Sequence, residues 1–236
     1  MAARASRRPL SRELLLATAV ALVDVGGIKA LTMRRLATAV DVEPMSLYYH
    51  LPDKEALLDG VVETVVAEIL AAVDDLGPRG ADQWRPRLRQ QFLAAREVML
   101  RHPWAPGLLG SRETVPAGLY AYFDGIVGDL VGAGFSYRLA HRALHALGSM
   151  ALGFAQEIFS PAPAAGSTQG DQAEADLAAM AEALPHLSAM VASEVHDSSD
   201  PMLGWCDGQV EFEFTLDLIL GGLERLKEQA RGSEGV

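Results

Sequence analysis

The sequence predicts an all-α protein with two parts, a small N-terminal head and a larger helical body. Half of its 236 residues are apolar but only 6% are aromatic, and Ala and Leu, which favour helices, dominate the apolar residues. They recur at intervals of three and four residues, the spacing of amphipathic helices, and alternating strand patterns are hard to find. A chain of this length can bury a sizeable core.

The head shows helix boundaries at short intervals. Gly26-Gly27 ends a first amphipathic run, and Thr32 has the residue type of an N-cap. Pro44 suits a first helical turn because that turn has no use for its missing N–H, and Pro52 interrupts the chain soon afterwards. We therefore expect three short helices and a longer one, over 11–25, 32–40, 44–50 and 54–73.

The body is also predicted to be helical. Its helical runs are separated by a turn at 77–80, a loop at 103–106 and the glycines at 132–134. The stretch 160–171 is rich in Pro, Ala, Gly and Ser, which predicts a mobile connection. The expected helices span 82–101, 116–132, 136–159, a segment broken near Pro185, and 206–229.

The charge is distributed unevenly along the chain. The formal net charge is −11. Residues 1–54 hold eight basic and five acidic side chains, a net charge of +3, which leaves −14 for the remainder. A basic head on an acidic body can meet DNA with one face while the body resists non-specific contact.

The single cysteine and the N-terminus bear on location. Cys206 excludes an internal disulfide framework and favours a reducing cytoplasm. Arg12 and Glu13 interrupt the nearest apolar run after the first arginines. We therefore expect neither a signal peptide nor a membrane span, and a cytoplasmic protein.

Residues 32–54 have the pattern of a DNA-reading motif. Leu36, Ala37, Val40 and Leu47 can form a small core between two short helices, and Ala37 lets them approach closely. This arrangement is a helix-turn-helix, whose second helix is short enough to lie in the major groove of DNA.

The residues expected to point outward from this motif suit DNA. Arg34 has the planar donor fork that matches guanine, and the free N–H groups after Thr32 point at a phosphate. A phosphate contact would also explain Lys54 at a helix start, where a cation gains nothing from the helix dipole. In the alternative interpretation, Tyr48 and Tyr49 are ordinary core aromatics and the arginines form a solvated face.

The motifs of the head resemble those of the tetracycline-repressor (TetR) family of regulators. They are Leu31-Thr32-x-Arg34-x-Leu36-Ala37, Val42, and Leu47-Tyr48-x-His50-x-x-x-Lys54-x-x-Leu57-Leu58. Asp41 stands where the family commonly has Gly, and Asp tolerates a left-handed turn. The body resembles the C-terminal domain of the tetracycline-repressor subgroup at His102-Pro103-Trp104-Ala105, Leu109-Gly110-Ser111-Arg112, 132–136, Leu152-Gly153-Phe154 and 212–223.

The resemblance implies a helix-turn-helix DNA-binding domain over 1–60 and a ligand-binding and dimerisation domain over 61–236. It implies a regulator, most simply a repressor, that binds a palindromic double-stranded DNA operator as a homodimer and is released by a small apolar or aromatic effector. No cofactor is implied. The DNA-binding residues implied are Arg34, Pro44, Met45 and Ser46 toward bases, and Thr32, Tyr48, Tyr49, His50 and Lys54 toward phosphates or the groove edge.

Two apolar stripes in the body predict the dimer interface. The last helix carries one stripe of apolar residues and a second stripe with Phe214 and Leu218, which implies burial both in its own domain and against a partner. In the alternative interpretation the apolar stripes of the last helix and of helix 136–159 both belong to the core of one chain. The stripes are Phe212, Leu216, Ile219, Leu220, Leu223 and Leu226 in the last helix, and Leu144, Leu147, Gly148, Ala151, Ala155 and Ile158 in helix 136–159.

A polar strip on helix 136–159 suggests a ligand cavity. The strip holds His141, His145, Ser149 and Gln156, and ordinary core or interface histidines are the alternative. The expected ligand-binding residues are Phe92, Trp104, Tyr120, Phe123, His145 and Ser149.

A metal is not expected. The His141–His145 spacing can bind one, but no third ligand is evident nearby. Relatives that bind a magnesium-chelated drug have His where this chain has Leu108, and Glu157 alone is poor support for that site. The effector is therefore expected to differ from tetracycline.

Two other classes of function fit the sequence less well. A helical enzyme would need a nucleophile–base set or a Glu-x-x-His motif, and the sequence offers no convincing example. Cys206 has no nearby positive partner, which favours a core thiol. A DNA-binding protein without a ligand would not need the long Trp- and His-containing body. We expect a regulator and not an enzyme.

Overall fold

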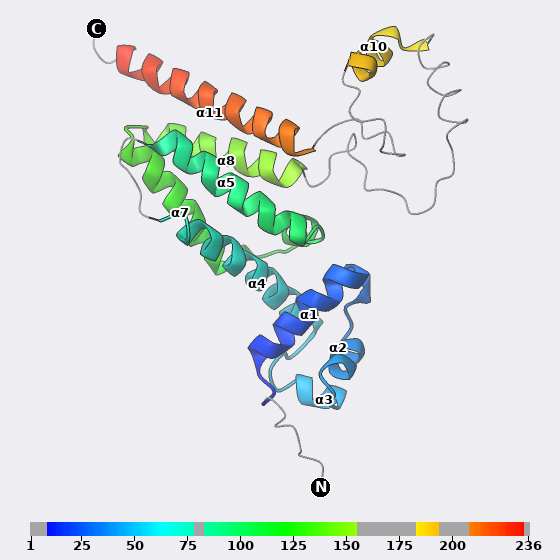
Figure 1. Cartoon of the computed structure of the whole chain (residues 1–236). Helices are drawn as coiled ribbons and strands as arrows, with labels where there is room; N and C mark the ends of the chain where they lie inside the picture. The colour runs from blue at the N-terminus through cyan, green and yellow to red at the C-terminus, as the bar shows by residue number, and fades with distance from the viewer. Residues whose placement is uncertain (1–8, 78–82, 155–182, 194–207, 234–236) are drawn as a thin grey trace.

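The computed structural model describes residues 9–77, 83–154, 183–193 and 208–233, in which every regular element is a helix (Figure 1). The predicted all-α class is therefore confirmed. The expectations on 155–159, 160–171 and Cys206 lie outside these residues. None of the described helices combines the length and apolar character needed to cross a bilayer.

The helices of the head begin where their capping residues predict. Ser11 caps α1 (Arg12–Gly26), and a short 3-10 helix, η1 (Ile28–Ala30), follows. The Thr32 hydroxyl accepts the N–H of Arg35 at 3.2 Å at the start of α2 (Met33–Ala39). The Asp53 carboxylate accepts the N–H of Ala56 at 2.7 Å and starts α4 (Lys54–Asp74). Each cap satisfies a backbone donor that the first turn leaves free.

The helix predicted over 44–50 is shorter in the structure. Helix α3 spans Pro44–Leu47, and residues 48–50 form a turn. The Leu47 carbonyl accepts from the N–H groups of His50 and Leu51, each at 2.9 Å, which closes the helix and brings Leu51 into the core. The buried Leu51 side chain therefore limits α3.

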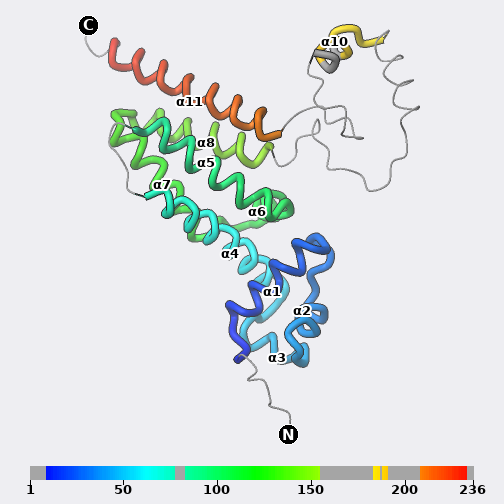
Figure 2. The backbone as a smooth tube through the Cα atoms, viewed as in Figure 1, coloured from blue at the N-terminus to red at the C-terminus, as the bar shows by residue number. Residues whose placement is uncertain are grey.

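Helix α4 joins the head to the body. It starts beside α1 and extends into the body, where it packs on α5 and α7 (Figure 2). Residues 103 and 104 form a turn, as predicted, but the short helix α6 (Ala105–Gly110) starts inside the segment 103–106 that was predicted as a loop. Pro106 falls in the first turn of α6, where proline is tolerated.

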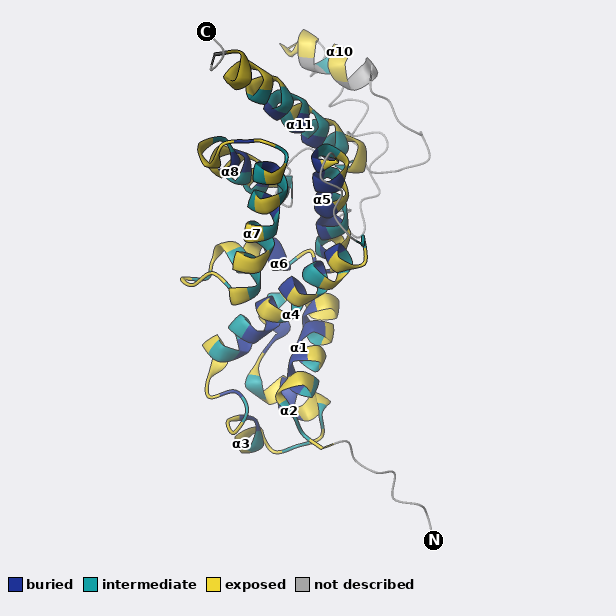
Figure 3. Cartoon of the chain, turned by 90° about the vertical axis from the view of Figure 1, so that its left-hand side faces the viewer, coloured by how far each residue is buried: buried dark blue, intermediate teal, exposed yellow. Residues whose placement is uncertain are grey.

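Four helices share the core of the body: α5 (Trp84–Arg101), α7 (Ala117–Gly132), α8 (Tyr137–Gly153) and α11 (Gly208–Ser233). A further helix, α10, spans Pro185–Ser193. Figure 3 shows buried residues on the sides of α5 and α11 that face their neighbours and exposed residues on the outer sides. This is the amphipathic pattern expected of a bundle.

The two stripes of α11 have different environments. Phe212, Leu216 and Leu220 are completely buried in the core of the chain. Phe214 is exposed, and Leu218 retains 58% of its accessible surface. Leu226, which was assigned to the inner stripe, is also exposed. Of the two stripes on α11, only the outer stripe, which contains Phe214 and Leu218, is free to contact a partner.

Candidate DNA-binding face and apolar cavity

The helix-turn-helix is held together by the core that the sequence predicted. Leu36, Ala37 and Leu47 are buried between α1, α2 and α3, and Val40 packs against them partly buried. The connection turns sharply at Asp41, whose φ of 55° lies in the left-handed region. The Val42 N–H then reaches the Ala37 carbonyl at 3.0 Å. The tolerance of Asp for this conformation explains why the turn works without glycine.

Most of the residues predicted to contact DNA are exposed. Tyr49 retains 92% of its accessible surface and Met45 72%, so neither is a core residue. Tyr48 is also exposed. The interpretation of the two tyrosines as core aromatics is therefore wrong. The other members are Thr32, Arg34, Pro44 and Lys54, which are exposed, and Ser46 and His50, which are half-buried.

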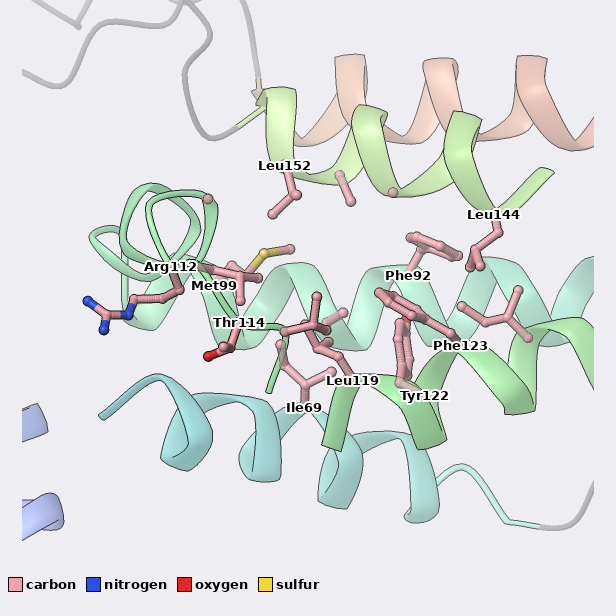
Figure 4. Close-up of a pocket in the computed structure, with 17 residues that line it drawn as sticks. Ile69, Phe92, Met99, Arg112, Thr114, Leu119, Tyr122, Phe123, Leu144 and Leu152 are labelled. Atoms are coloured by element: carbon pink, nitrogen blue, oxygen red, sulfur yellow. The ribbon is translucent and has the colours of Figure 1, made fainter. Parts of the chain in front are cut away.

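An apolar cavity of about 260 Å³ lies in the body, away from this face (Figure 4). Residues from five helices, α4 to α8, form its wall. Phe92, Tyr122 and Phe123 supply aromatic rings, and Arg112 and Thr114 are polar. The remaining lining residues are Ile69, Ala95, Met99, Leu109, Gly110, Val115, Leu119, Ile126, Leu144, Gly148, Ala151 and Leu152.

The structure brings only two of the six expected ligand-binding residues to this cavity, Phe92 and Phe123. Tyr120 retains 62% of its accessible surface, and Trp104, His145 and Ser149 are also outside the lining. These four residues do not line this cavity. Tyr122 and Arg112 were missed.

The position of each residue around its helix explains why the expected residues lie outside the cavity. The cavity side of α7 carries residues 119, 122, 123 and 126, the spacing of a single helix face. Tyr120 lies on another face. In α8 the small-residue stripe of Leu144, Gly148 and Ala151 lines the cavity, whereas His141, His145 and Ser149, the described residues of the predicted polar strip, are exposed. The prediction placed the polar strip at the cavity and the small-residue stripe at the dimer interface. In the structure the small-residue stripe is the one that faces the cavity.

Trp104 and His102 instead join the body to the head. The Asp24 carboxylate in α1 accepts from Trp104 Nε1 at 2.7 Å and lies 2.8 Å from Nδ1 of His102. The other ring nitrogen of His102 is 3.2 Å from Oε2 of Glu68 in α4. His102 is buried. This cluster holds the C-terminal end of α1 against the body.

Arg112 links the cavity wall to the start of α4. Its stem lines the cavity, and its guanidinium points away from it (Figure 4). Nε donates to Oδ1 of Asp59 at 2.7 Å, and Nη2 is 2.8 Å from Oε2 of Glu55. The hydrogen bond that the Arg112 guanidinium donates to Glu55 raises the pKa of Arg112. Glu55 and Asp59 follow Lys54 closely, so this pair lies between the cavity and the DNA-binding face.

The exposed histidines of α8 pack edge to face. The His141 and His145 rings are 4.6 Å apart. Among the described residues, no group of three His, Cys, Asp or Glu side chains is arranged to hold a metal ion.

An exposed helix-turn-helix on a helical body with an apolar cavity defines a class of DNA-binding regulators. Two family profiles agree with this class. The profile described as "Bacterial regulatory proteins, tetR family" matches residues 15–61, and "Tetracyclin repressor-like, C-terminal domain" matches residues 76–226. The chain belongs to the TetR family of transcriptional regulators, and we assign it to the regulators and not to the enzymes.

Individual relatives match over most of the chain. The tetracycline repressor protein class C of Escherichia coli is 29% identical over 219 residues, 92% of each chain. A possible TetR family regulator from Streptomyces coelicolor A3(2) has 30% identity and a TM-score of 0.73, and the match covers 92% of this chain and all of that one.

The fold is also similar to that of ActR from Streptomyces coelicolor, solved in complex with actinorhodin. The TM-score is 0.71 at 23% identity, over 93% of this chain and 99% of that one.

Proposed function

We propose that this protein is a repressor that binds a palindromic DNA operator as a homodimer and leaves it when a small apolar or aromatic effector enters the cavity. The observation that carries this proposal is the physical connection between the two sites. The DNA-binding face lies at the end of the head, the cavity lies in the body, and α4 with its Arg112 contacts runs between them.

DNA recognition is assigned to the exposed end of the head. Arg34 in α2 and Met45 and Ser46 in α3 would face base edges. Thr32 and Lys54 lie at helix starts, where the free N–H groups and the ammonium would meet phosphates. Pro44, Tyr48, Tyr49 and His50 complete the face. The partner is DNA, so the protein is expected to work in the bacterial cytoplasm.

The homodimer is assigned to the outer faces of α8 and α11, which pack beside each other. Phe214 and Leu218 are the large apolar residues exposed on α11. A second copy related by a twofold axis would cover these two outer faces and present two heads to a palindrome. Exposed aromatic and aliphatic groups at this position are typical of such a contact.

The effector site is assigned to the apolar cavity. Its volume of about 260 Å³ lies near the lower limit of roughly 300 Å³ for the pockets of drug-sized ligands. A compact apolar molecule fits it better than a large polar one. One relative is named a tetracycline repressor, and ActR was solved in complex with actinorhodin, which supports a small-molecule effector for this protein.

Two linked experiments test this function. Selection from a pool of randomised duplexes should enrich a palindromic site, measured by sequencing and confirmed by fluorescence anisotropy. A thermal-shift screen should then find compounds that raise the unfolding temperature, because a ligand bound to the folded state stabilises it. Compounds that stabilise the protein should also release the selected duplex. A protein that enriches no duplex, or that binds stabilising compounds without any change in DNA affinity, would contradict the proposal.

A further inference from the structure

The His102 ring is held between two carboxylates from different parts of the chain. Its Nδ1 lies 2.8 Å from Oδ1 of Asp24 in α1, and its Nε2 lies 3.2 Å from Oε2 of Glu68 in α4. Only 8% of the His102 side chain remains exposed. The ring therefore bridges the head and the connecting helix from the end of α5.

These two contacts require two donors from one ring. An ionised carboxylate has no proton and can only accept, so each ring nitrogen must carry a proton to form its hydrogen bond. A neutral imidazole has one N–H, and its other nitrogen presents a lone pair. That lone pair would face a carboxylate oxygen and repel it. The arrangement therefore fits the charged imidazolium, whereas a neutral ring satisfies only one of the two carboxylates.

The position of Asp24 gives independent support for a positive ring. Asp24 lies in the last turn of α1, which ends at Gly26. The C-terminal end of a helix carries a partial negative charge, so an acidic side chain there is unfavourable unless a cation compensates it. Trp104 Nε1 also donates to Oδ1 of Asp24, at 2.7 Å, but the indole is neutral. The imidazolium supplies the compensating charge.

Arg101 and Glu97 are the other charged side chains connected to this cluster in the described part of the chain. Arg101 Nη2 donates to the same Oε2 of Glu68 at 3.2 Å, and Nη1 lies 3.9 Å from Glu97. The Trp104 ring, 5.7 Å from that of His102, does not titrate. Carboxylates and guanidinium groups ordinarily keep their charge near neutral pH, whereas histidine is the side chain that ordinarily changes charge between about pH 5 and 8. The bridge is therefore sensitive to protons through its ring.

We propose that His102 is a proton-dependent positioning residue of the DNA-binding head. With two protons it holds the last turn of α1 against α4 and the end of α5. With one proton it releases one of the two carboxylates, and the link between α1 and α4 opens. DNA binding must then restrict motion of the head that the closed link already restricts, so operator affinity falls as the pH rises. This last step rests on the proposed function, whereas the opening of the link does not.

Hydrogen exchange of the full chain tests the link without DNA or a ligand. Deuterium uptake is measured by mass spectrometry at pH 6.0 and 8.5, with labelling times scaled to the intrinsic exchange rate at each pH. In the unmodified protein the last turn of α1 should lose protection at pH 8.5 by about 10-fold, the size of one hydrogen bond to a charged group. Equal protection at the two pH values would overturn the proposal.

Two substitutions have opposite expected results. His102→Gln places a donor against only one of the carboxylates, so the turn should be weakly protected at both pH values. Glu68→Gln lets a neutral ring satisfy both neighbours, because the new amide donates to Nε2 while Nδ1 donates to Asp24. The turn should then stay protected at pH 8.5. His141→Gln, on the exposed side of α8, is the control and should behave like the unmodified protein.

The contrast between the variants distinguishes a proton-dependent role from a merely structural one. A structural role would lower protection in both variants at every pH, and that result would overturn the proposal. Circular dichroism checks that each variant is folded. If His102→Gln does not fold, Glu68→Gln decides, because loss of protection at pH 8.5 in that variant contradicts the two-donor argument.

Fluorescence anisotropy with the duplex selected from the randomised pool tests the consequence for DNA. The drop in affinity from pH 6.0 to 8.5 should be larger in the unmodified protein, and this excess should be lost in His102→Gln and Glu68→Gln. His50 is present in all of these proteins, so the comparison cancels its contribution. The same drop in all of them would overturn the positioning role. If no duplex is enriched, the proposed function fails, while hydrogen exchange still decides whether the link opens.

Discussion

Arg112 and Asp59 join the cavity to the helix that leaves the DNA-binding head, through a hydrogen bond of 2.7 Å from Nε to Oδ1. Glu55, one turn earlier in α4, holds the same guanidinium. A ligand that displaces the segment around Arg112 must therefore move or strain the first turns of α4. The adjacent Lys54 would change position relative to DNA.

We predict that Arg112→Met weakens the coupling between ligand and operator. Methionine keeps much of the stem that lines the cavity but removes both contacts with α4. Couplings of this kind commonly change affinity by about 5- to 150-fold, and the factor should fall toward one in the variant. The measurement is operator affinity by anisotropy with and without a stabilising compound. Arg101→Met, which removes an exposed pair with Glu68, is the control and should keep the coupling. Full coupling in Arg112→Met would assign the signal to another route.

Arg34→Ala should weaken operator binding by about 1–3 kcal/mol and relax specificity at one base position, because a bidentate contact to guanine is lost. Arg35 is its exposed neighbour on α2 and is outside the predicted set. Arg35→Ala should change affinity less and leave the sequence preference intact. Unchanged binding by Arg34→Ala would mean that α2 and α3 meet DNA differently from our placement.

Leu218→Glu should produce a folded monomer. The new carboxylate would have to be buried at the twofold seam without a partner, which costs far more than leaving it in water. Leu100→Glu is the control, because Leu100 is an exposed residue of α5. Sedimentation velocity at micromolar concentration distinguishes the species. An unmodified protein that sediments as a monomer would exclude the homodimer.

The fully buried Leu220 is unsuitable for that experiment. Its side chain lies in the core of the chain itself. Leu220→Glu is therefore expected to unfold the protein, and loss of the circular dichroism signal would accompany any loss of the dimer.

Magnesium should not be needed for ligand binding. Leu108 stands at the position where the resemblance to magnesium-dependent regulators would imply a His, and the described residues include no cluster of three metal-ligating side chains. Titrations of a stabilising compound with and without EDTA should give the same affinity. A large loss on chelation would show that a cation takes part after all.

Local chemistry made the head predictable from sequence. Ser11, Thr32 and Asp53 cap their helices through atoms only three residues away, and Asp41 permits the turn. Such contacts depend on neighbours along the chain, which the sequence displays directly. The same spacing predicted that the residues proposed to contact DNA point outward, and most of them are exposed.

The sequence also determined that α7, α8 and α11 are amphipathic, but only the tertiary structure decided what each face meets. Phe123 and Tyr120 are three residues apart on α7, yet one lines the cavity and the other is exposed. Leu220 and Leu218 differ in the same way, and Trp104 pairs with Asp24, 80 residues earlier in the chain. Periodicity shows which residues share a helix face. The rotation of each helix against its neighbours depends on how side chains distant in sequence fill the space between them, and that packing exists only in the folded chain.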